Sequence, residues 1–156
     1  LPMDYQKAAE AGYREAVSTG ILAGYETVDI KAILTGASFH EVDSSEMAFK
    51  IASSMAFKAA AAKASPMLLE PVMKIEVVTP SQFLGECLGD LNSRRAQIQS
   101  MEGDDTTQTI KGMIPLSETF RYATDLRSIT TGRAGFSLEF DHYSPAPRSI
   151  IEGMKA

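Results

Sequence analysis

The second half of the chain alternates between strand and helix patterns, and this order restricts the fold more than any other feature. Apolar and polar residues alternate where strands are predicted, and turn-forming residues separate the segments. The predicted elements are a strand at 72–79, a helix at 80–94, strands at 97–102 and 109–114, a helix at 117–128 and a strand at 134–140. The order βαββαβ is that of the ferredoxin-like split βαβ unit, an antiparallel sheet with both helices on one face.

Local signals set the ends of these elements. Pro80 begins the first helix, because proline is favoured at the start of a helix. Gly103 opens the turn of the hairpin, and Ser117 is the predicted N-cap of the second helix. Pro145 and Pro147 then mark the exit from the last strand into a short C-terminal helix.

An Ala-rich helix at 44–63 dominates the first half of the chain. Asp43 is its predicted N-cap, and Glu46 lies three residues later at the capping-box position. Between Asp43 and Pro66 the segment contains no Gly or Pro that would interrupt a helix. At 100° per residue its apolar side chains cover a broad arc, so we expect the helix to be buried against a sheet or other helices.

Two further elements are predicted before this helix, and one after it. An amphipathic helix starts near Asp4 and ends at Gly20, and the alternating residues 27–34 predict a half-buried strand. Residues 67–69 suit a short strand, and the dipeptide Glu70-Pro71 is the predicted domain boundary. The fold class is therefore α+β, with one domain at 1–70 and a ferredoxin-like domain at 71–156.

Composition excludes several classes of protein. The 156 residues are 44% apolar and 22% charged, with a net charge of −5, so a general nucleic-acid coat is not expected and any RNA contact must be local. No apolar run approaches the roughly 18 residues of a membrane span. The single cysteine, Cys87, cannot form an internal disulfide, which fits a reducing cytoplasm.

Few residues carry recognisable chemistry. The chain has no GxxxxGK[ST] motif and hence no P-loop nucleotide site. His40 and His142 lie in different predicted domains and Cys87 lies on a predicted helix, so no metal-ligand spacing is present. His40, just before the predicted N-cap, is one candidate functional residue, and an ordinary solvated loop histidine is the alternative. No catalytic, cofactor-binding or metal-binding residues are predicted.

Arginines form the second set of candidates. Arginine is scarce in the first half of the chain and frequent in the second. A guanidinium group suits bidentate binding of phosphate, and the alternative role is a charge that complements the C-terminal dipole of a helix. The candidates are Arg94, Arg95, Arg127 and Arg133.

Five sequence blocks give the chain a resemblance to a known family. In order they are LAGY at 22–25, FHEVDSSEMAFK at 39–50, LEPVMK at 69–74, GDLNSRR at 89–95, and YATDLRS at 122–128 with GR at 132–133. The chain resembles bacterial elongation factor G through these blocks, which run nearly end to end. The resemblance implies a C-terminal fragment: the end of domain IV, which is the C-terminal half of a ribosomal-protein-S5-domain-2-like fold, followed by the ferredoxin-like domain V.

The resemblance also implies a function. The intact factor is a ribosome-dependent GTPase that moves tRNA and mRNA forward by one codon, and its GTP and Mg²⁺ sites lie outside this segment. His40 corresponds to the histidine in the tip of domain IV, which contacts tRNA and mRNA at the decoding region. Domain V contacts large-subunit rRNA near the stalk base, with the four arginines named above as candidates. No cofactor is expected in this segment itself, and the expected location is the cytoplasm, without a membrane partner.

Two departures from the family leave an alternative open. The segment TGASF at 35–39 replaces the family's Tyr-Asp-Gly-Ser-Tyr, and Arg121 stands where the family has glycine. The alternative is a paralogue that acts in ribosome recycling or ribosome protection. Further alternatives are an enzyme of another class, which small-molecule turnover would favour, and a protein-interaction module, which RNA-free binding of ribosomal proteins would favour.

The start of the chain adds one expectation. Leu1-Pro2 leads directly into a helix without an initiator Met, as expected of a fragment. The upstream strands of domain IV would then be missing beneath the 44–63 helix, which would expose a sheet edge and part of an apolar face. We therefore expect partial disorder at 1–70, or self-association of the isolated fragment through the exposed edge.

Overall fold

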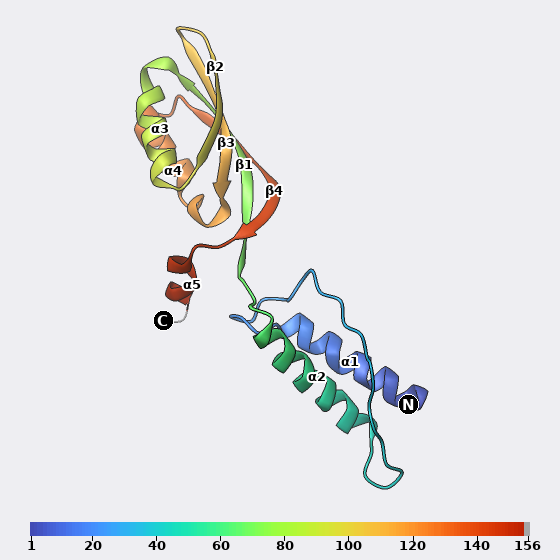
Figure 1. Cartoon of the computed structure of the whole chain (residues 1–156). Coiled ribbons are helices and arrows are strands. Elements are labelled where there is room, and N and C mark those ends of the chain that lie inside the picture. Colours follow the sequence, from blue (N-terminus) through green and yellow to red (C-terminus); the bar gives the residue numbers. More distant parts are fainter. Residues whose placement is uncertain (155–156) are drawn as a thin grey trace. The chain divides into compact units, whose positions relative to one another are not determined.

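A four-stranded antiparallel sheet with two helices organises the second half of the chain (Figure 1). The structure, a computed structural model, describes residues 1–154. The sheet and its helices lie in the unit Leu69–Ala146, and the other unit is Leu1–Leu68 with the segment from Pro147 onward. The elements of the sheet unit are β1 (Leu69–Pro80), α3 (Leu84–Ser93), β2 (Gln97–Gly103), β3 (Thr107–Pro115), α4 (Tyr122–Thr130) and β4 (Gly135–Pro145).

The strand order confirms the predicted ferredoxin-like fold. The strands lie in the order β2-β3-β1-β4, so β1 pairs with β3 on one side and β4 on the other, both antiparallel. Helices α3 and α4 both lie over one face of the sheet (Figure 1). Each helix therefore connects two strands that are not neighbours, as the βαββαβ order requires.

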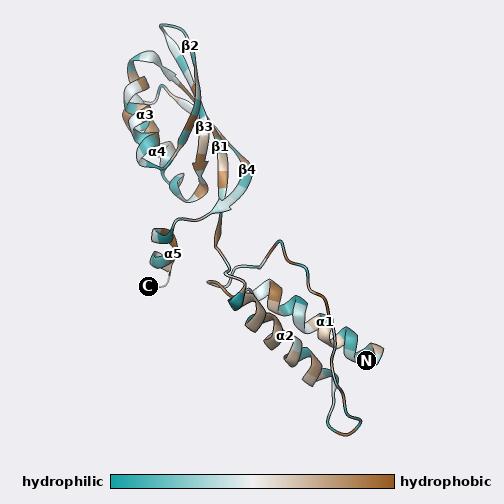
Figure 2. Cartoon of the chain, in the orientation of Figure 1, coloured by the Kyte–Doolittle hydropathy of each residue, from teal (hydrophilic) through white to brown (hydrophobic). Residues whose placement is uncertain are grey.

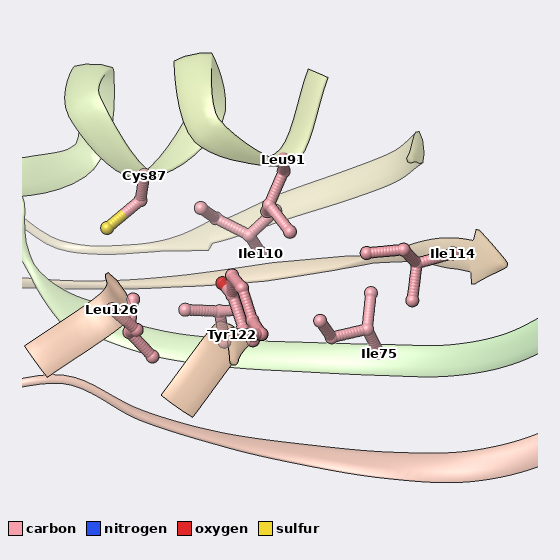
Figure 3. Packing of buried hydrophobic residues seen from close by; sticks show 8 residues of the cluster. Ile75, Cys87, Leu91, Ile110, Ile114, Tyr122 and Leu126 are labelled. Atoms are coloured by element: carbon pink, nitrogen blue, oxygen red, sulfur yellow. The ribbon is translucent and has the colours of Figure 1, made fainter. Parts of the chain in front are cut away.

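Strand and helix periodicity together build the core of this unit. Ile75 and Val77 alternate on β1 and point to the helix-covered face, while Leu91 lies four residues after Cys87 on α3. Figure 3 shows side chains of this core meeting between the sheet and the helices. The buried cluster comprises Ile75, Val77, Cys87, Leu91, Ile110, Ile114, Tyr122 and Leu126.

The structure corrects several boundaries predicted for this half. Pro80 is the last residue of β1 and does not begin the first helix, because α3 starts at Leu84 after the 3₁₀ turn Ser81–Phe83. β1 is continuous from Leu69 and so contains Glu70 and Pro71, and β4 continues beyond Phe140 to Pro145. In both cases the strand is longer than the segment in which apolar and polar residues alternate. The reason is that β1 and β4 pair with each other, starting from Leu69↔Pro145. The predicted N-cap Ser117 is also wrong. It lies in the 3₁₀ turn Leu116–Glu118, and α4 begins at Tyr122.

Two long helices form the other unit. α1 (Met3–Thr19) and α2 (Glu46–Lys63) lie side by side (Figure 1), and a short helix, α5 (Arg148–Met154), follows β4. Gly12 sits at a very close approach of the two long helices. A Cβ atom there would lie 2.0 Å from the carbonyl oxygen of Lys50. Lys50 also reaches across the pair, with its Nζ 2.8 Å from Glu15 Oε2.

The predicted N-cap of α2 is wrong. Ser45 caps the helix, because its Oγ accepts a hydrogen bond of 3.1 Å from the N–H of Ala48. Asp43 lies in the turn that precedes this cap. A serine two residues closer to the helix therefore takes the role that the sequence assigned to Asp43.

The predicted strand at 27–34 is also absent, and these residues are irregular. A strand needs a neighbour for its backbone hydrogen bonds, and within residues 1–154 no segment pairs with this one.

The expected burial of α2 is wrong for this chain, and the expected exposure of an apolar face is confirmed. No residue of α2 is buried. Met47, Ile51 and Met55 are 63%, 53% and 65% exposed, although Figure 2 shows that α2 is mostly apolar. Met47, Ile51 and Met55 occur at i, i+4 and i+8 and form one stripe, which we call the Met47 face.

Among the helices of the described residues, none has the length and apolar character needed to cross a membrane.

Replacing Gly12 by Ala should destabilise the α1–α2 pair. The new Cβ would overlap the backbone of Lys50, and backbone cannot move aside as a side chain can. We expect a loss of about 1–3 kcal/mol in the free energy of unfolding, measured by hydrogen exchange of α1 and α2 amides. Gly89→Ala is the matched control, because a Cβ at Gly89 meets open space. It should stabilise α3 by about 0.5–1 kcal/mol. Equal effects of the two substitutions would contradict this packing.

Candidate functional site

His40 lies at one end of a short exposed turn that precedes α2. The N–H of His40 donates to Ser44 Oγ at 2.9 Å, and the N–H of Ser44 donates to the carbonyl oxygen of His40 at 3.1 Å. This reciprocal pair closes a turn over 41–43, in which Val42 is 92% exposed. His40 itself is exposed. Its backbone is therefore fixed while its imidazole faces solvent.

An aromatic cluster anchors the residue next to His40. The Tyr5 ring of α1 stacks on the Phe49 ring of α2 with a centroid distance of 4.6 Å, and the centroid of the Phe39 ring lies 6.0 Å from that of Tyr5. Aromatic contacts of this kind stabilise beyond the area that the rings bury. Phe39 thus ties the start of the turn to α1 and, through Tyr5, to α2, and His40 is held outward from a fixed base.

Arg94 is used inside the sheet unit. Its guanidinium donates to Asp90 on α3, to Asp125 on α4 and to the carbonyl oxygen of Glu118. It also lies 5.1 Å from the centroid of the Tyr122 ring. Burial disfavours its charge, but the hydrogen bonds to Asp90 and Asp125 outweigh this effect and hold the pKa of Arg94 above its usual value. Only 14% of the side chain is exposed.

Arg95 is likewise paired. Two of its nitrogens donate to the two carboxylate oxygens of Glu70 at 2.9 and 3.1 Å, and Nε donates to Glu118 at 3.2 Å. The hydrogen bonds to Glu70 raise the pKa of Arg95. This bidentate pair links the end of α3 to the start of β1.

Arg127 and Arg133 differ from these two. Both residues are exposed, and neither forms an ion pair within residues 1–154. Arg127 lies on α4 beside a groove of about 220 Å³ between α4 and the start of β4. Arg133 follows α4, with its guanidinium 5.5 Å from the centroid of the Phe83 ring. The four arginines therefore fall into two pairs: Arg94 and Arg95 are bonded to carboxylates of the sheet unit, and Arg127 and Arg133 form no such bond in the described residues.

The open face of the sheet does not suit base stacking. Residues between the core positions of β1, such as Lys74 and Glu76, face away from the helices and pair with Lys111, Ser137 and Glu139 on the neighbouring strands. Sheets that bind single-stranded RNA stack bases on aromatic rings. These paired positions of β1, β3 and β4 carry none.

Arg121 is a further exposed arginine that is not among the four candidates predicted from the sequence. It is exposed at the N-cap of α4, with φ 70° and ψ −1° in the left-handed region. The available signal was a basic residue at a position where the family has glycine. Among residues 1–154 no three His, Cys, Asp or Glu side chains are grouped to hold a metal ion.

Replacing Arg95 by Ala should destabilise the sheet unit. Glu70, whose side chain is 12% exposed, would lose its bidentate partner. We expect the free energy of unfolding, measured by denaturant titration, to fall by about 1–3 kcal/mol. Arg95 has a positive φ of 59°, and alanine has a Cβ as arginine does, so the backbone strain is the same in the wild-type chain and the variant. Lys111→Ala removes the exposed pair with Glu102 and should change stability by less than about 0.5 kcal/mol. A smaller effect at Arg95 than at Lys111 would count against a structural role for Arg95.

Comparisons with known proteins cover nearly all of the described chain. The family model described as elongation factor G, domain IV, matches residues 1–65, and the model described as elongation factor G C-terminus matches residues 67–154. A crystal structure of a protein from Thermus thermophilus is similar, with 40% sequence identity and a TM-score of 0.82. That match covers 99% of this chain and 23% of the other, so the chain spans less than a quarter of that relative's length.

Proposed function

This chain belongs to the elongation factor G family, and on that premise we propose that it is part of a ribosome-binding translation factor that promotes GTP-dependent movement of tRNA and mRNA. In this proposal the intact factor acts in the cytoplasm, where it binds translating ribosomes. Support comes from the order of the two matched domains, which together account for residues 1–65 and 67–154.

The geometry around His40 is the single observation that carries the role of the first unit. A group that follows a moving tRNA–mRNA helix needs a fixed base, an outward direction and a hydrogen-bonding atom. The Tyr5–Phe49–Phe39 cluster supplies the base, and the closed turn directs His40 into solvent. In this proposal the imidazole hydrogen-bonds near the codon–anticodon helix in the decoding region.

The sheet unit is assigned to large-subunit rRNA near the stalk base. Arginine forks suit phosphate oxygens, and Arg127 and Arg133 are exposed without a carboxylate partner in the described residues. They are therefore the first candidates for this contact. Arg94 and Arg95 would have to exchange their carboxylates for phosphates, so their contribution is expected to be smaller.

GTP and Mg²⁺ do not fit the residues of this chain. A nucleotide site needs a phosphate cradle, and the sequence has no GxxxxGK[ST] motif. Both groups therefore belong, in this proposal, to another part of the intact factor, and the work of this chain is contact and positioning.

A paralogue that acts in ribosome recycling or protection is the second candidate function. The favouring observations are the TGASF segment before His40 and Arg121 in the place of a glycine. Ribosome-splitting and translocation assays on the full-length factor separate the two functions, because a recycling factor should split ribosomes without advancing the mRNA.

Replacing His40 by Ala in the full-length factor should slow translocation strongly and leave ribosome-stimulated GTP hydrolysis nearly unchanged. The side chain is exposed, so stability should change by less than about 0.5 kcal/mol. Single-turnover translocation and hydrolysis rates check this directly.

His142→Ala is the matched control, since it removes the other exposed histidine, which lies in the sheet unit. It should leave translocation unchanged. A parallel loss of hydrolysis and translocation in His40→Ala, or unfolding of its domain, would make the tip assignment wrong.

The 156-residue chain should neither bind nor hydrolyse GTP. Titration calorimetry with GTP and Mg²⁺ should give no heat beyond dilution, since the sequence lacks a phosphate-binding loop. Saturable binding would overturn the assignment of the nucleotide to another part of the factor.

A further inference from the structure

We propose that Phe120 and Arg121 form an additional RNA contact in the sheet unit, with Phe120 stacking on an unpaired base and Arg121 binding a phosphate. This inference rests on the proposed binding of large-subunit RNA and assigns a specific part of that surface. The two residues stand together at the corner that leads into α4.

The corner is a turn in which arginine is a poor choice for the backbone. The N–H of Tyr122 donates to the carbonyl oxygen of Thr119 at 3.0 Å, and the third residue, Arg121, has φ 70° and ψ −1°. These values are those of the third position of a type II turn, which favours Gly or Asn because a Cβ is disfavoured there. Arginine at this position therefore lowers the stability of the unit.

A second arginine with positive φ shows what can offset such a cost. Arg95 has φ 59°, and its guanidinium is bonded to Glu70 and Glu118 within the unit. Arg121 forms no side-chain hydrogen bond or ion pair with residues 1–154. No side-chain hydrogen bond or ion pair inside the described chain thus offsets the unfavourable backbone conformation of Arg121. Residues held in strained conformations concentrate at sites of binding and catalysis.

The neighbouring aromatic residue supplies the second half of the surface. Phe120 is 70% exposed, whereas the next aromatic residue, Tyr122, is fully buried. The turn therefore presents one ring and one guanidinium to solvent at adjacent positions. An aromatic ring that stacks a base beside an arginine that binds the backbone is a common arrangement for single-stranded RNA.

Charge favours RNA over an acidic protein. Arg121 and Arg133 flank the nine-residue helix α4, and Arg127 lies on it. At 1.5 Å per residue this helix is roughly 13 Å long, so the three cations are spread over a distance of two or more phosphate spacings. A polymer with regularly repeated charges can meet cations at such separations better than a compact acidic patch can.

The test measures the melting temperature and the RNA affinity of the same variants. Arg121→Gly removes the cation and relieves the backbone, so the melting temperature should rise while binding to bacterial large ribosomal subunits weakens. Loss of one phosphate contact should reduce the slope of log K against log salt by about one. Phe120→Ala should weaken binding about 5- to 150-fold, the range for loss of one base stack, without lowering the melting temperature.

Thr131→Gly is the matched control. Thr131 also has positive φ, 52°, and is exposed at the other end of α4, but it carries no charge. Its replacement should raise the melting temperature and leave binding unchanged. Arg121→Lys keeps the charge and the strained backbone, and it should bind between the wild-type chain and Arg121→Gly.

Binding is measured with the 156-residue chain on intact large subunits and on protein-free large-subunit rRNA. Weaker binding of Arg121→Gly to both supports the inference. Wild-type binding with no loss in Arg121→Gly overturns it and leaves the proposed function standing. A loss on intact subunits alone means that a ribosomal protein is the partner, which also overturns it. If the wild-type chain binds neither probe, the proposed function fails and this inference fails with it.

Discussion

The sheet unit depends on burying one face of its sheet under two short helices. Tyr122 is at the centre of this layer. Its ring is fully buried, meets Phe136 edge to face at 4.9 Å, and has Arg94 above it. Its hydroxyl is buried without a hydrogen-bond partner in the described residues, and burial raises the pKa of that hydroxyl. An unpaired hydroxyl is unfavourable, so the packing of the ring must outweigh it.

This packing also decides which charges are available. α3 and α4 approach each other over the core, so Arg94 can bond to Asp90 and Asp125 at once. The carboxylates near the α3 end are thereby neutralised within the unit. Arg127 and Arg133, at and after α4, form no such pair within residues 1–154. The surface offered to a partner is therefore a consequence of how the helices pack, although the chain as a whole has no excess of positive charge.

The first unit follows a different constraint, the close contact of α1 and α2 at Gly12. Small residues on α1, including Ala9 and Ala16, let the helices approach, and the Met47 face of α2 stays exposed. The same pair carries the aromatic cluster that fixes Phe39 beside His40. A rigid base for an exposed histidine thus arises from helix packing alone, without a strand at 27–34.

Sequence alone determined the elements that local pattern specifies: α1 ending at Gly20, the βαββαβ order, and the position of His40 just before a helix. It did not determine choices that depend on the precise geometry of the folded chain or on contacts distant in the sequence. Ser45 replaced Asp43 as the cap of α2, since the cap depends on which nearby oxygen reaches a helical N–H. The end of β4 was set by pairing with β1, and the engagement of Arg94 and Arg95 by carboxylates 23 to 31 residues away. Such partners become neighbours only when the sheet and its helices have formed. Periodicity in the sequence indicates which face a residue occupies, but it carries no information about which residue lies opposite.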